Sequence, residues 1–228
     1  VFENQNNLMS ETFRNIRTNI QFMLQNDRKV ILVTSTVSGE GKSFTSANLA
    51  ISLSLLGKKV VIVGLDIRKP GLNKVFSLSS KEKGITQYLS NPEMDLMSLV
   101  QPSDVNKNLF ILPGGTVPPN PTELLEDGSL ATLMQDLRDE YDYIFIDCPP
   151  IDIVADTQII EQYADRTLFV VRAGLLDRSL LPELESIYQE KRFKNLSVIL
   201  NGTESTGGRY GYRYGYHNGY DSYYGNTK

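Results

Sequence analysis

The stretch Thr34-Ser-Thr-Val-Ser-Gly-Glu-Gly-Lys-Ser43 decides the fold class of this chain. An apolar run at residues 30–34 predicts a buried strand before it, and the helical spacing of residues 44–56 predicts a helix after it. Strand, glycine-rich loop and helix in this order are typical of a phosphate-binding loop, in which backbone N–H groups and the helix N-terminus surround phosphate oxygens. The strict pattern has glycine where Thr36 stands, so the match is incomplete.

Two side chains of this loop carry a chemical role in such a site. Lys42 can bridge the terminal phosphates of a nucleotide, and the Ser43 hydroxyl is placed to ligate Mg²⁺. We therefore expect ATP or ADP together with Mg²⁺ as ligands. The expected nucleotide-binding residues are Ser38, Gly39, Glu40, Gly41, Lys42, Ser43 and Phe44.

Apolar runs and helical segments alternate along the rest of the chain. This alternation predicts an α/β fold of the P-loop NTPase type, with a mainly parallel sheet flanked by helices and with ligands at the carboxyl ends of the strands. The further predicted strands are residues 60–65, 109–112, 143–147, 167–171 and 196–200, and the further predicted helices are residues 8–25, 122–138, 154–163 and 180–191.

Carboxylates follow two of the predicted strands. Asp66 ends the second strand with Arg68 close behind it, and Asp147 ends the strand at residues 143–147 after four apolar residues. We expect Asp66 and Asp147 to join Ser43 in the metal shell, and we expect Lys42, Asp66, Arg68 and Asp147 to be the catalytic residues. The simpler alternative makes Asp66 a loop cap and Arg68 a surface charge.

Three other polar residues have weaker assignments. The Asn201 amide could hydrogen-bond the nucleotide base, although a turn residue beside Gly202 is equally plausible. Cys148 has no zinc-like spacing around it, so we expect a structural role. The start of the 122–138 helix has Asn120 as N-cap, Pro121 at the first helical position and Glu123 reaching back.

Composition limits the class of protein. A chain of 228 residues with 40% hydrophobic and 22% charged residues is ordinary for one folded domain, and a formal charge of −4 argues against a nucleic-acid partner. A single cysteine fits a cytoplasmic setting, and no apolar run approaches the roughly 20 residues that span a bilayer. The sequence begins at Val1 without an initiator Met, which suggests a trimmed product or a fragment of a longer protein, so a membrane part could lie outside it.

The pattern divides the chain into three parts. Residues 1–28 are expected to form a helical segment, residues 29–203 the P-loop domain, and residues 204–228 a flexible, largely disordered tail rich in glycine and tyrosine. Seven of the 12 tyrosines of the chain lie in this tail, whereas disordered segments usually hold few aromatic residues.

These motifs resemble the bacterial tyrosine kinases of capsule and exopolysaccharide synthesis over essentially the whole chain. The resemblance is carried by Ser-Gly-Glu-Gly-Lys-Ser43, Leu-Asp66-Ile-Arg-Lys-Pro70, Pro118-Pro-Asn-Pro-Thr-Glu-Leu-Leu125, Phe145-Ile-Asp-Cys-Pro-Pro150 and the terminal tyrosine cluster. It implies an ATP-dependent protein-tyrosine autokinase at the cytoplasmic, inner face of the cell membrane, which works with a membrane-embedded activator and with polysaccharide synthesis or export machinery.

The resemblance also implies how subunits meet. The element Glu11-Thr-Phe-Arg14-Asn-Ile-Arg17 matches the family's Glu-x-x-Arg-x-x-Arg, which joins neighbouring subunits of a homo-oligomeric ring, and we expect its three charges to share one helix face. The simpler reading is a solvated face with one weak ion pair. In such a ring each tail enters a neighbour's site, and the implied phosphoacceptors are Tyr210, Tyr212, Tyr214, Tyr216, Tyr220, Tyr223 and Tyr224.

One position departs from the family pattern. The second motif of the family is Asp-x-Asp-x-Arg, and its first aspartate, which is thought to activate the attacking hydroxyl, is Gly64 here. Losing a general base should cost roughly 10²- to 10⁴-fold in rate while leaving nucleotide binding intact. Two alternatives therefore stay open: a nucleotide-switch ATPase that resembles the partition proteins, and a non-catalytic ATP-binding scaffold.

Overall fold

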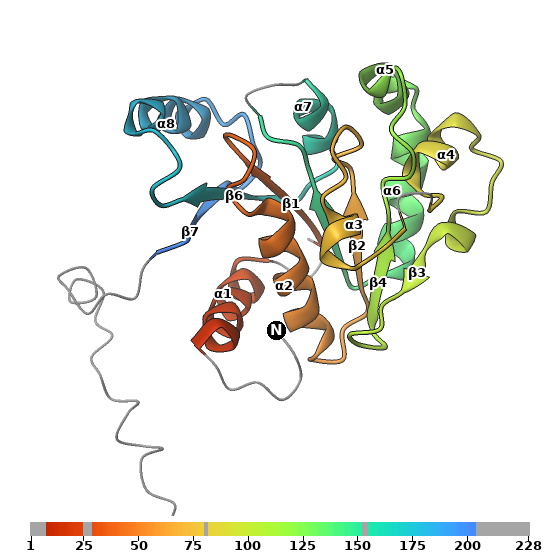
Figure 1. Ribbon diagram of the computed structural model, residues 1–228, viewed down its shortest axis with the longest axis horizontal. Helices are drawn as coiled ribbons and strands as arrows, with labels where there is room; N and C mark the ends of the chain where they lie inside the picture. The colour runs from red at the N-terminus through yellow and green to blue at the C-terminus, as the bar shows by residue number, and fades with distance from the viewer. Residues whose placement is uncertain (1–7, 25–28, 80–81, 152–154, 204–228) are drawn as a thin grey trace, which may run out of the picture.

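The computed structural model describes residues 8–24, 29–79, 82–151 and 155–203. Within these ranges seven strands form one sheet in the order β3-β4-β2-β5-β1-β6-β7 (Figure 1). Neighbouring strands pair in parallel except β3 and β4, which are antiparallel. This confirms the predicted α/β class. The strands are β1 Val30–Ser35, β2 Val60–Gly64, β3 Gln101–Pro102, β4 Leu109–Leu112, β5 Tyr143–Asp147, β6 Arg166–Arg172 and β7 Ser197–Asn201.

Helices connect these strands and lie on both faces of the sheet (Figure 1). None of the helices in the described part of the chain is long and apolar enough to cross a membrane. The α-helices are α1 Leu8–Met23, α2 Lys42–Ser54, α3 Leu72–Val75, α4 Ile85–Ser90, α5 Pro121–Glu126, α6 Ser129–Glu140, α7 Asp156–Glu161 and α8 Leu181–Gln189, and two 3-10 turns are η1 Leu96–Leu99 and η2 Arg178–Leu180.

Strands β1, β2 and β5 are mostly apolar and buried because both faces of the sheet are covered there. In β1 the side chains alternate between two cores: Val30 and Leu32 belong to the core that includes α4 and α6, whereas Ile31 and Val33 belong to the core that includes α1 and α2. Each fully buried side chain of this size contributes roughly 1.5–3 kcal/mol. Strand β1, which lies beside the central strand β5, therefore contributes to both cores and also leads into the phosphate-binding loop.

Helix α1 packs against α2, the helix that follows the phosphate-binding loop. Phe13 and Ile20 are buried in the core shared with α2, and the Phe13 ring lies edge-on to the Phe44 ring with centroids 5.9 Å apart. Arg17 donates from Nη1 to the carbonyl oxygen of Ser52 at 2.8 Å. The N-terminal helix is therefore part of the packed domain, even though the minimal nucleotide fold does not require it.

Two predictions for the segment around residue 120 were wrong in detail. The single helix predicted at residues 122–138 is two helices, α5 and α6, because Gly128 between them has a φ of 93° and so leaves the helical conformation. Asn120 precedes Pro121 as predicted, but its side chain makes no capping hydrogen bond and no capping box with Glu123 forms. The interruption at Gly128 lets α5 contact both α4 and α7 while α6 packs on the sheet.

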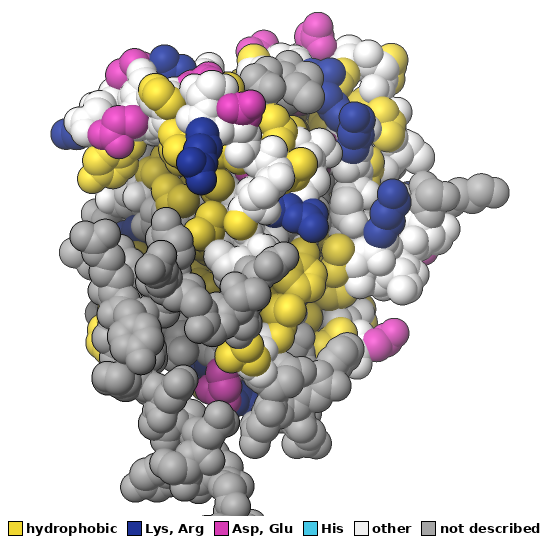
Figure 2. All heavy atoms as spheres, turned by 60° about the vertical axis from the view of Figure 1, so that its left-hand side comes forward, with side chains coloured by type: hydrophobic (Ala, Val, Ile, Leu, Met, Phe, Trp, Pro, Cys, Tyr) yellow, Lys and Arg dark blue, Asp and Glu magenta, His cyan; other side chains and the backbone are white. Residues whose placement is uncertain are grey.

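Strand β7 leaves one edge of the sheet open. Its side chains alternate between half-buried and exposed, and Val198 and Leu200 are 52% and 59% exposed. Figure 2 shows hydrophobic side chains at the surface on the side of the molecule where α8 and β7 lie. Helix α8 adds the exposed side chains of Leu181 and Tyr188. The core on this side is consequently thinner than at β1, β2 and β5.

Asp165 connects several elements at the N-terminal ends of the strands, away from the phosphate-binding loop. Its carboxylate accepts the N–H groups of Lys29 and Val30, both at 2.9 Å, and the guanidinium of Arg138 at 2.9 and 3.0 Å. Partial burial by itself would raise the pKa of Asp165, but the bonds from Arg138, Val30 and Lys29 together hold it below its usual value. The residue thus ties the start of β1 to α6 through an ionised carboxylate.

The lowered pKa makes a testable contribution to stability. The ionised form is favoured in the folded state, so the contribution is complete above the unfolded pKa of about 4 and is lost as pH falls through the folded value. We expect Asp165→Asn to lower the free energy of unfolding by roughly 1–3 kcal/mol near neutral pH. The deficit should shrink below about pH 4, as measured by urea unfolding across pH. A deficit independent of pH would contradict this account.

Candidate functional site

The phosphate-binding loop has the geometry that its glycines predict. Gly39 and Gly41 have φ values of 93° and 98°, a left-handed conformation that favours glycine, and α2 begins at Lys42 directly after them. Lys42 is only 7% exposed, so its ammonium is held inside the site. The expected residue Ser38 lies exposed in the same loop. Strand β1, loop and helix α2 thus form the predicted phosphate cradle.

Asp147 stands at the carboxyl end of β5 and faces this cradle. Its Oδ2 accepts the Ser43 hydroxyl at 2.7 Å, whereas its Oδ1 is buried and has no hydrogen-bond partner among the described residues. Complete burial raises the pKa of Asp147 to about 7, even though the Ser43 hydroxyl and the Lys42 charge oppose the shift. A buried oxygen without a partner is costly, so this atom is suited to accept a hydrogen bond or to bind a cation.

Asp66 brings a second carboxylate to the same edge. Its backbone N–H donates to the Asp147 carbonyl at 2.9 Å, and its Oδ1 accepts the Lys69 N–H at 3.0 Å. Burial raises the pKa of Asp66, against the opposing effects of the Lys69 bond and the Lys42 charge. The loop after β2 therefore holds this carboxylate close to Asp147.

The donors at this edge fit Mg²⁺. Ser43 offers a hydroxyl oxygen and Asp147 offers the unpartnered Oδ1, with the Asp66 carboxyl nearby. Mg²⁺ prefers oxygen ligands and is usually held by one or two carboxylates together with substrate phosphates and water. The chemistry of these donors suits Mg²⁺, and Ser43, Asp66 and Asp147 stay the predicted metal ligands.

Gly64 is the last residue of β2 and pairs with Asp147 across the sheet. A Cβ atom at position 64 would lie 3.1 Å from the backbone nitrogen of Gly114 and 3.4 Å from Cδ1 of Leu72. A Cβ at position 114 would in turn lie 2.9 Å from the Gly64 carbonyl oxygen. The loop after β4 therefore packs closely against the place where the family has its first aspartate.

Gly71 is a site residue that the sequence patterns did not single out. A Cβ atom there would collide with the Ser43 hydroxyl oxygen and would lie 3.7 Å from Oδ2 of Asp147. The φ of Gly71 is −75°, so its backbone conformation is open to any residue and only the lack of a side chain matters. The Lys69-Pro70-Gly71 turn thus lies directly against the expected metal ligands.

The expected catalytic residue Arg68 is turned toward other partners. Its guanidinium donates to both carboxylate oxygens of Asp156, at 2.8 and 3.1 Å, and to the Thr122 hydroxyl at 2.9 Å. Asp156 is fully buried and also accepts the Thr122 hydroxyl. Arg68 therefore joins the loop after β2 to α5 and α7, and a role of Arg68 on the nucleotide stays a prediction. Sequence reasoning missed Asp156, whose only signal was an acid at a predicted helix start.

Two other expected nucleotide residues make contacts within the protein. The Asn201 amide donates from Nδ2 to the Glu40 carbonyl oxygen at 2.8 Å, so this amide lies against the loop whatever role it has toward a base. Phe44 is 41% exposed on α2 and contacts Phe13 of α1. Cys148 is completely buried and burial raises its pKa, which agrees with the structural role expected for it.

The three charged residues of α1 that are expected at a subunit contact do not all face the same way. Arg14 forms an ion pair with Glu11 on the outer side of α1. Arg17 instead turns to α2, where its Nη1 contacts the Ser52 carbonyl and hydroxyl oxygens at 2.8 and 3.3 Å. The prediction that all three share one face was therefore wrong, because six residues along a helix are not a whole number of turns. The seven tail tyrosines lie outside the described residues.

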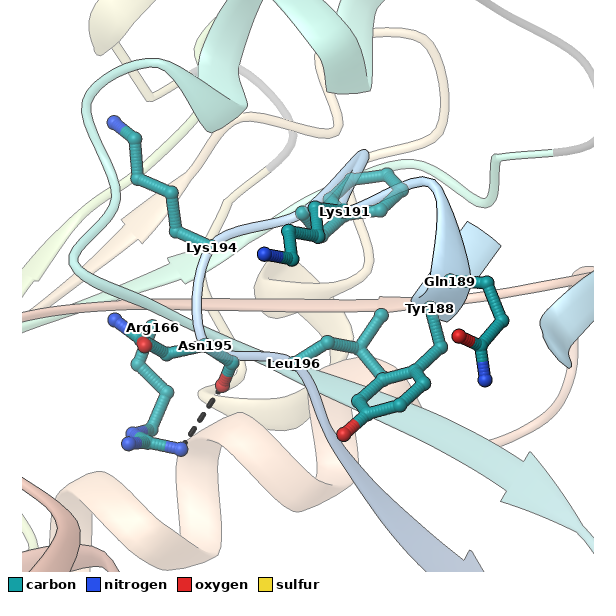
Figure 3. A pocket seen from close by; sticks show the side chains of 8 residues that line it. Arg166, Tyr188, Gln189, Lys191, Lys194, Asn195 and Leu196 are labelled. Atoms are coloured by element: carbon teal, nitrogen blue, oxygen red, sulfur yellow. Dashed lines mark hydrogen bonds between the residues drawn. The ribbon is translucent and has the colours of Figure 1, made fainter. Parts of the chain in front are cut away.

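A separate cavity of about 680 Å³ lies at the opposite edge of the sheet, where β6 and β7 begin (Figure 3). Its cationic side chains are not gathered toward one point: Arg166 donates to the Asn195 carbonyl at 2.9 Å, and Lys194 donates to the Gln162 carbonyl at 2.6 Å. The cavity is therefore separate from the predicted nucleotide site, and no residue of the phosphate-binding loop lines it. Other lining residues are Tyr188, Gln189, Lys191, Phe193 and Leu196.

Several proteins similar to this chain in sequence bear the name tyrosine-protein kinase. The profile of the AAA domain family matches residues 28–198. The tyrosine-protein kinase CpsD of Streptococcus agalactiae serotype III (strain NEM316) is 36% identical over 201 residues, covering 88% of this chain and 85% of the relative. The tyrosine-protein kinase YwqD of Bacillus subtilis (strain 168) is 36% identical over 207 residues, covering 90% and 86%. The chain belongs to the bacterial tyrosine kinases.

Solved structures agree with this placement in the bacterial tyrosine kinases. The chimerical protein CapA2B2 superposes with a TM-score of 0.78 at 30% identity, over 86% of this chain and 85% of that one. The septum site-determining protein MinD of Pyrococcus horikoshii OT3, complexed with Mg-ADP, has a TM-score of 0.62 at 21% identity, over 76% and 70%. At that identity the likeness to MinD shows the P-loop fold alone.

The buried acid of this bacterial tyrosine kinase gives a prediction for Asp147→Asn. Because the folded pKa of Asp147 is raised to about 7, the metal-free protein should lose stability as pH rises from the unfolded pKa of about 4 through that value. Asparagine carries no charge to bury and should raise the melting temperature at about pH 8 without Mg²⁺, with the gain vanishing near pH 5. Melting curves across pH check this, and an Asn variant that is less stable at both pH values would contradict it.

A second prediction concerns Gly71→Ala. The added methyl group has to displace the Ser43 hydroxyl, so we expect the gain in ADP affinity that Mg²⁺ provides to fall by roughly tenfold, while ADP binding in EDTA stays near the parent value. Calorimetric titration with and without Mg²⁺ measures both quantities. Equal losses in the two conditions would show a general disturbance of the loop instead.

Proposed function

We propose that this chain is an ATP-dependent protein-tyrosine autokinase that phosphorylates its own tyrosine-rich C-terminal segment. The observation that carries the proposal is the convergence of Lys42, Ser43 and Asp147 at one sheet edge, with a buried Asp147 oxygen that lacks a partner. The printed names of the relatives, tyrosine-protein kinases, support this choice among P-loop activities. The substrate class is a tyrosine hydroxyl.

The proposed reaction needs mainly positioning and neutralisation of charge. The tyrosine oxygen forms a bond to the γ-phosphorus, the bond from that phosphorus to the β,γ-bridging oxygen breaks, and ADP leaves while the hydroxyl proton passes to solvent. Lys42 offsets the charge on the phosphate oxygens, and the loop N–H groups orient them. Bound Mg²⁺, held through Ser43, Asp147 and Asp66, would add further charge neutralisation.

The subunit arrangement and the setting belong to the same proposal. The seven tail tyrosines would enter the site of a neighbouring subunit in a ring, with the exposed Glu11 and Arg14 of α1 available for the contact between subunits. Arg17 would support that contact by fixing α1 on α2. The ring would work at the inner face of the cell membrane with a membrane-embedded activator, in a system that polymerises or exports polysaccharide.

Gly64 favours a second candidate, an ATP-binding scaffold with little catalysis. No carboxylate stands at the place where this family has its first aspartate, and Gly114 packs close against that place. A reaction without a positioned base would run roughly 10²- to 10⁴-fold more slowly. Nucleotide binding through Lys42 and Ser43 does not depend on position 64, so binding and catalysis can be separated.

Intact mass spectrometry after incubation with Mg-ATP tests the proposal. We expect slow addition of phosphoryl groups to the parent chain, mapping to residues 210–224, and an increase in rate for Gly64→Asp once Gly114 shifts by a few tenths of an ångström. Lys42→Met is the matched blank, since it removes the phosphate contact at similar side-chain volume. ATP binding by parent and Gly64→Asp without phosphate on either would reject autonomous kinase activity and leave the scaffold.

A further inference from the structure

Glu40 is a buried carboxylate inside the phosphate-binding loop that does not face the phosphates. It is 0% exposed, and both of its oxygens have backbone donors: Oε2 accepts the Val37 N–H at 2.9 Å and Oε1 accepts the Arg172 N–H at 3.2 Å. Burying a carboxylate is costly unless donors surround it. The Val37 N–H is thereby turned away from any phosphate, and the carboxylate links the loop to the end of β6.

Two more hydrogen bonds join the phosphate-binding loop to the ends of β6 and β7. The Arg172 guanidinium donates from Nη1 to the Gly39 carbonyl at 3.0 Å, and the Asn201 amide donates to the Glu40 carbonyl at 2.8 Å. Arg172 and Asn201 are paired across β6 and β7, and the Ala173 N–H donates to the Asn201 carbonyl at 2.9 Å. We call the side chains of Glu40, Arg172 and Asn201 the loop clasp.

The close fit of the loop against β7 supports a function for this clasp. A Cβ atom at Gly41 would collide with the Asn201 amide, so the loop backbone lies directly on the side chain that ends β7. A Cβ at Gly39 would lie 3.6 Å from the Leu175 side chain. The loop is thus held against the ends of β6 and β7.

We infer that Glu40 is a positioning residue that holds the phosphate-binding loop in its ligand-ready shape through the loop clasp. This rests on the proposed nucleotide binding. A loop that is ordered before the ligand arrives loses less conformational entropy on binding, so the clasp increases affinity without touching the nucleotide. Because Asn201 ends β7, the same contacts fix the point at which the chain leaves the sheet toward residues 204–228.

Glu40→Gln tests the inference with little change in shape. Glutamine keeps one acceptor oxygen but replaces the other by an NH2 group, which can only donate, so either the Val37 or the Arg172 N–H loses its acceptor. We expect the dissociation constant for Mg-ADP to rise by roughly tenfold or more. Amide hydrogen exchange of residues 36–41 should accelerate in the ligand-free protein as well, which reports on the loop independently of nucleotide.

Asp165→Asn is the matched control. It makes the same chemical change in another carboxylate that accepts two backbone N–H groups. That carboxylate lies at the N-terminal ends of the strands, whereas the phosphate-binding loop lies at their C-terminal ends. It should lower the melting temperature while leaving the dissociation constant for Mg-ADP unchanged. Asn201→Ala removes the hydrogen bond from Asn201 to the Glu40 carbonyl at a half-buried position and should also weaken Mg-ADP binding, which keeps the test valid if Glu40→Gln folds poorly.

The outcomes separate the inference from the proposed function. If the parent binds Mg-ADP and both clasp variants keep its affinity and its exchange rates, Glu40 is merely structural and the inference is overturned. A parent that binds no Mg-ADP would overturn the proposed function and the inference with it. Weaker binding and faster loop exchange in the clasp variants but not in Asp165→Asn would establish the positioning role, whatever the kinase assay gives.

Discussion

Asp147 is the point at which the parts of this site are joined. Its backbone carbonyl accepts the N–H groups of Leu65 and Asp66, at 3.0 and 2.9 Å, which fastens the end of β2 to the end of β5. Its carboxylate accepts the Ser43 hydroxyl at the start of α2. Phosphate loop, metal ligands and the turn after β2 therefore share one anchor. These contacts hold the start of α2 and the end of β2 against the end of β5.

The molecule tolerates an electrostatically costly arrangement at this edge because the rest of the fold is well covered. Burial raises the pKa values of both Asp66 and Asp147, which means that their ionised forms are disfavoured until a cation arrives. The two apolar cores on the faces of the sheet offset the free-energy cost of burying these two carboxylates. Proteins that bind charged ligands commonly combine a stable core with a binding site whose buried charges reduce stability.

The difference from the family pattern at Gly64 can be understood from the residues that pack around it. Replacement of an aspartate by glycine would ordinarily leave an empty space, but here the Gly114 backbone lies close to where the side chain would begin. The loops after β2 and β4 are thus adapted to each other at two glycines. The contacts that join the phosphate-binding loop to β6 and β7 include neither Gly64 nor Gly114. A change at position 64 can therefore alter catalysis without removing those contacts.

The sequence by itself determined the phosphate-binding loop, the mainly parallel sheet and the acids at the ends of β2 and β5. These depend on local order and on the period of apolar residues, which are written in short stretches of chain. Periodicity also predicted helices, but it missed α3 and α4, of four and six residues, because so few residues hold little more than one turn of pattern.

Only the tertiary structure decided which distant groups meet. It paired Arg68 with Asp156, set Asn201 against Glu40, turned Arg17 toward α2 and brought Gly71 against Ser43. Each of these contacts joins segments that are separated in sequence, from 28 positions for Gly71 and Ser43 to 161 for Asn201 and Glu40. Such contacts follow from how helices and loops pack on the sheet, and residue type and spacing along the chain do not encode that packing.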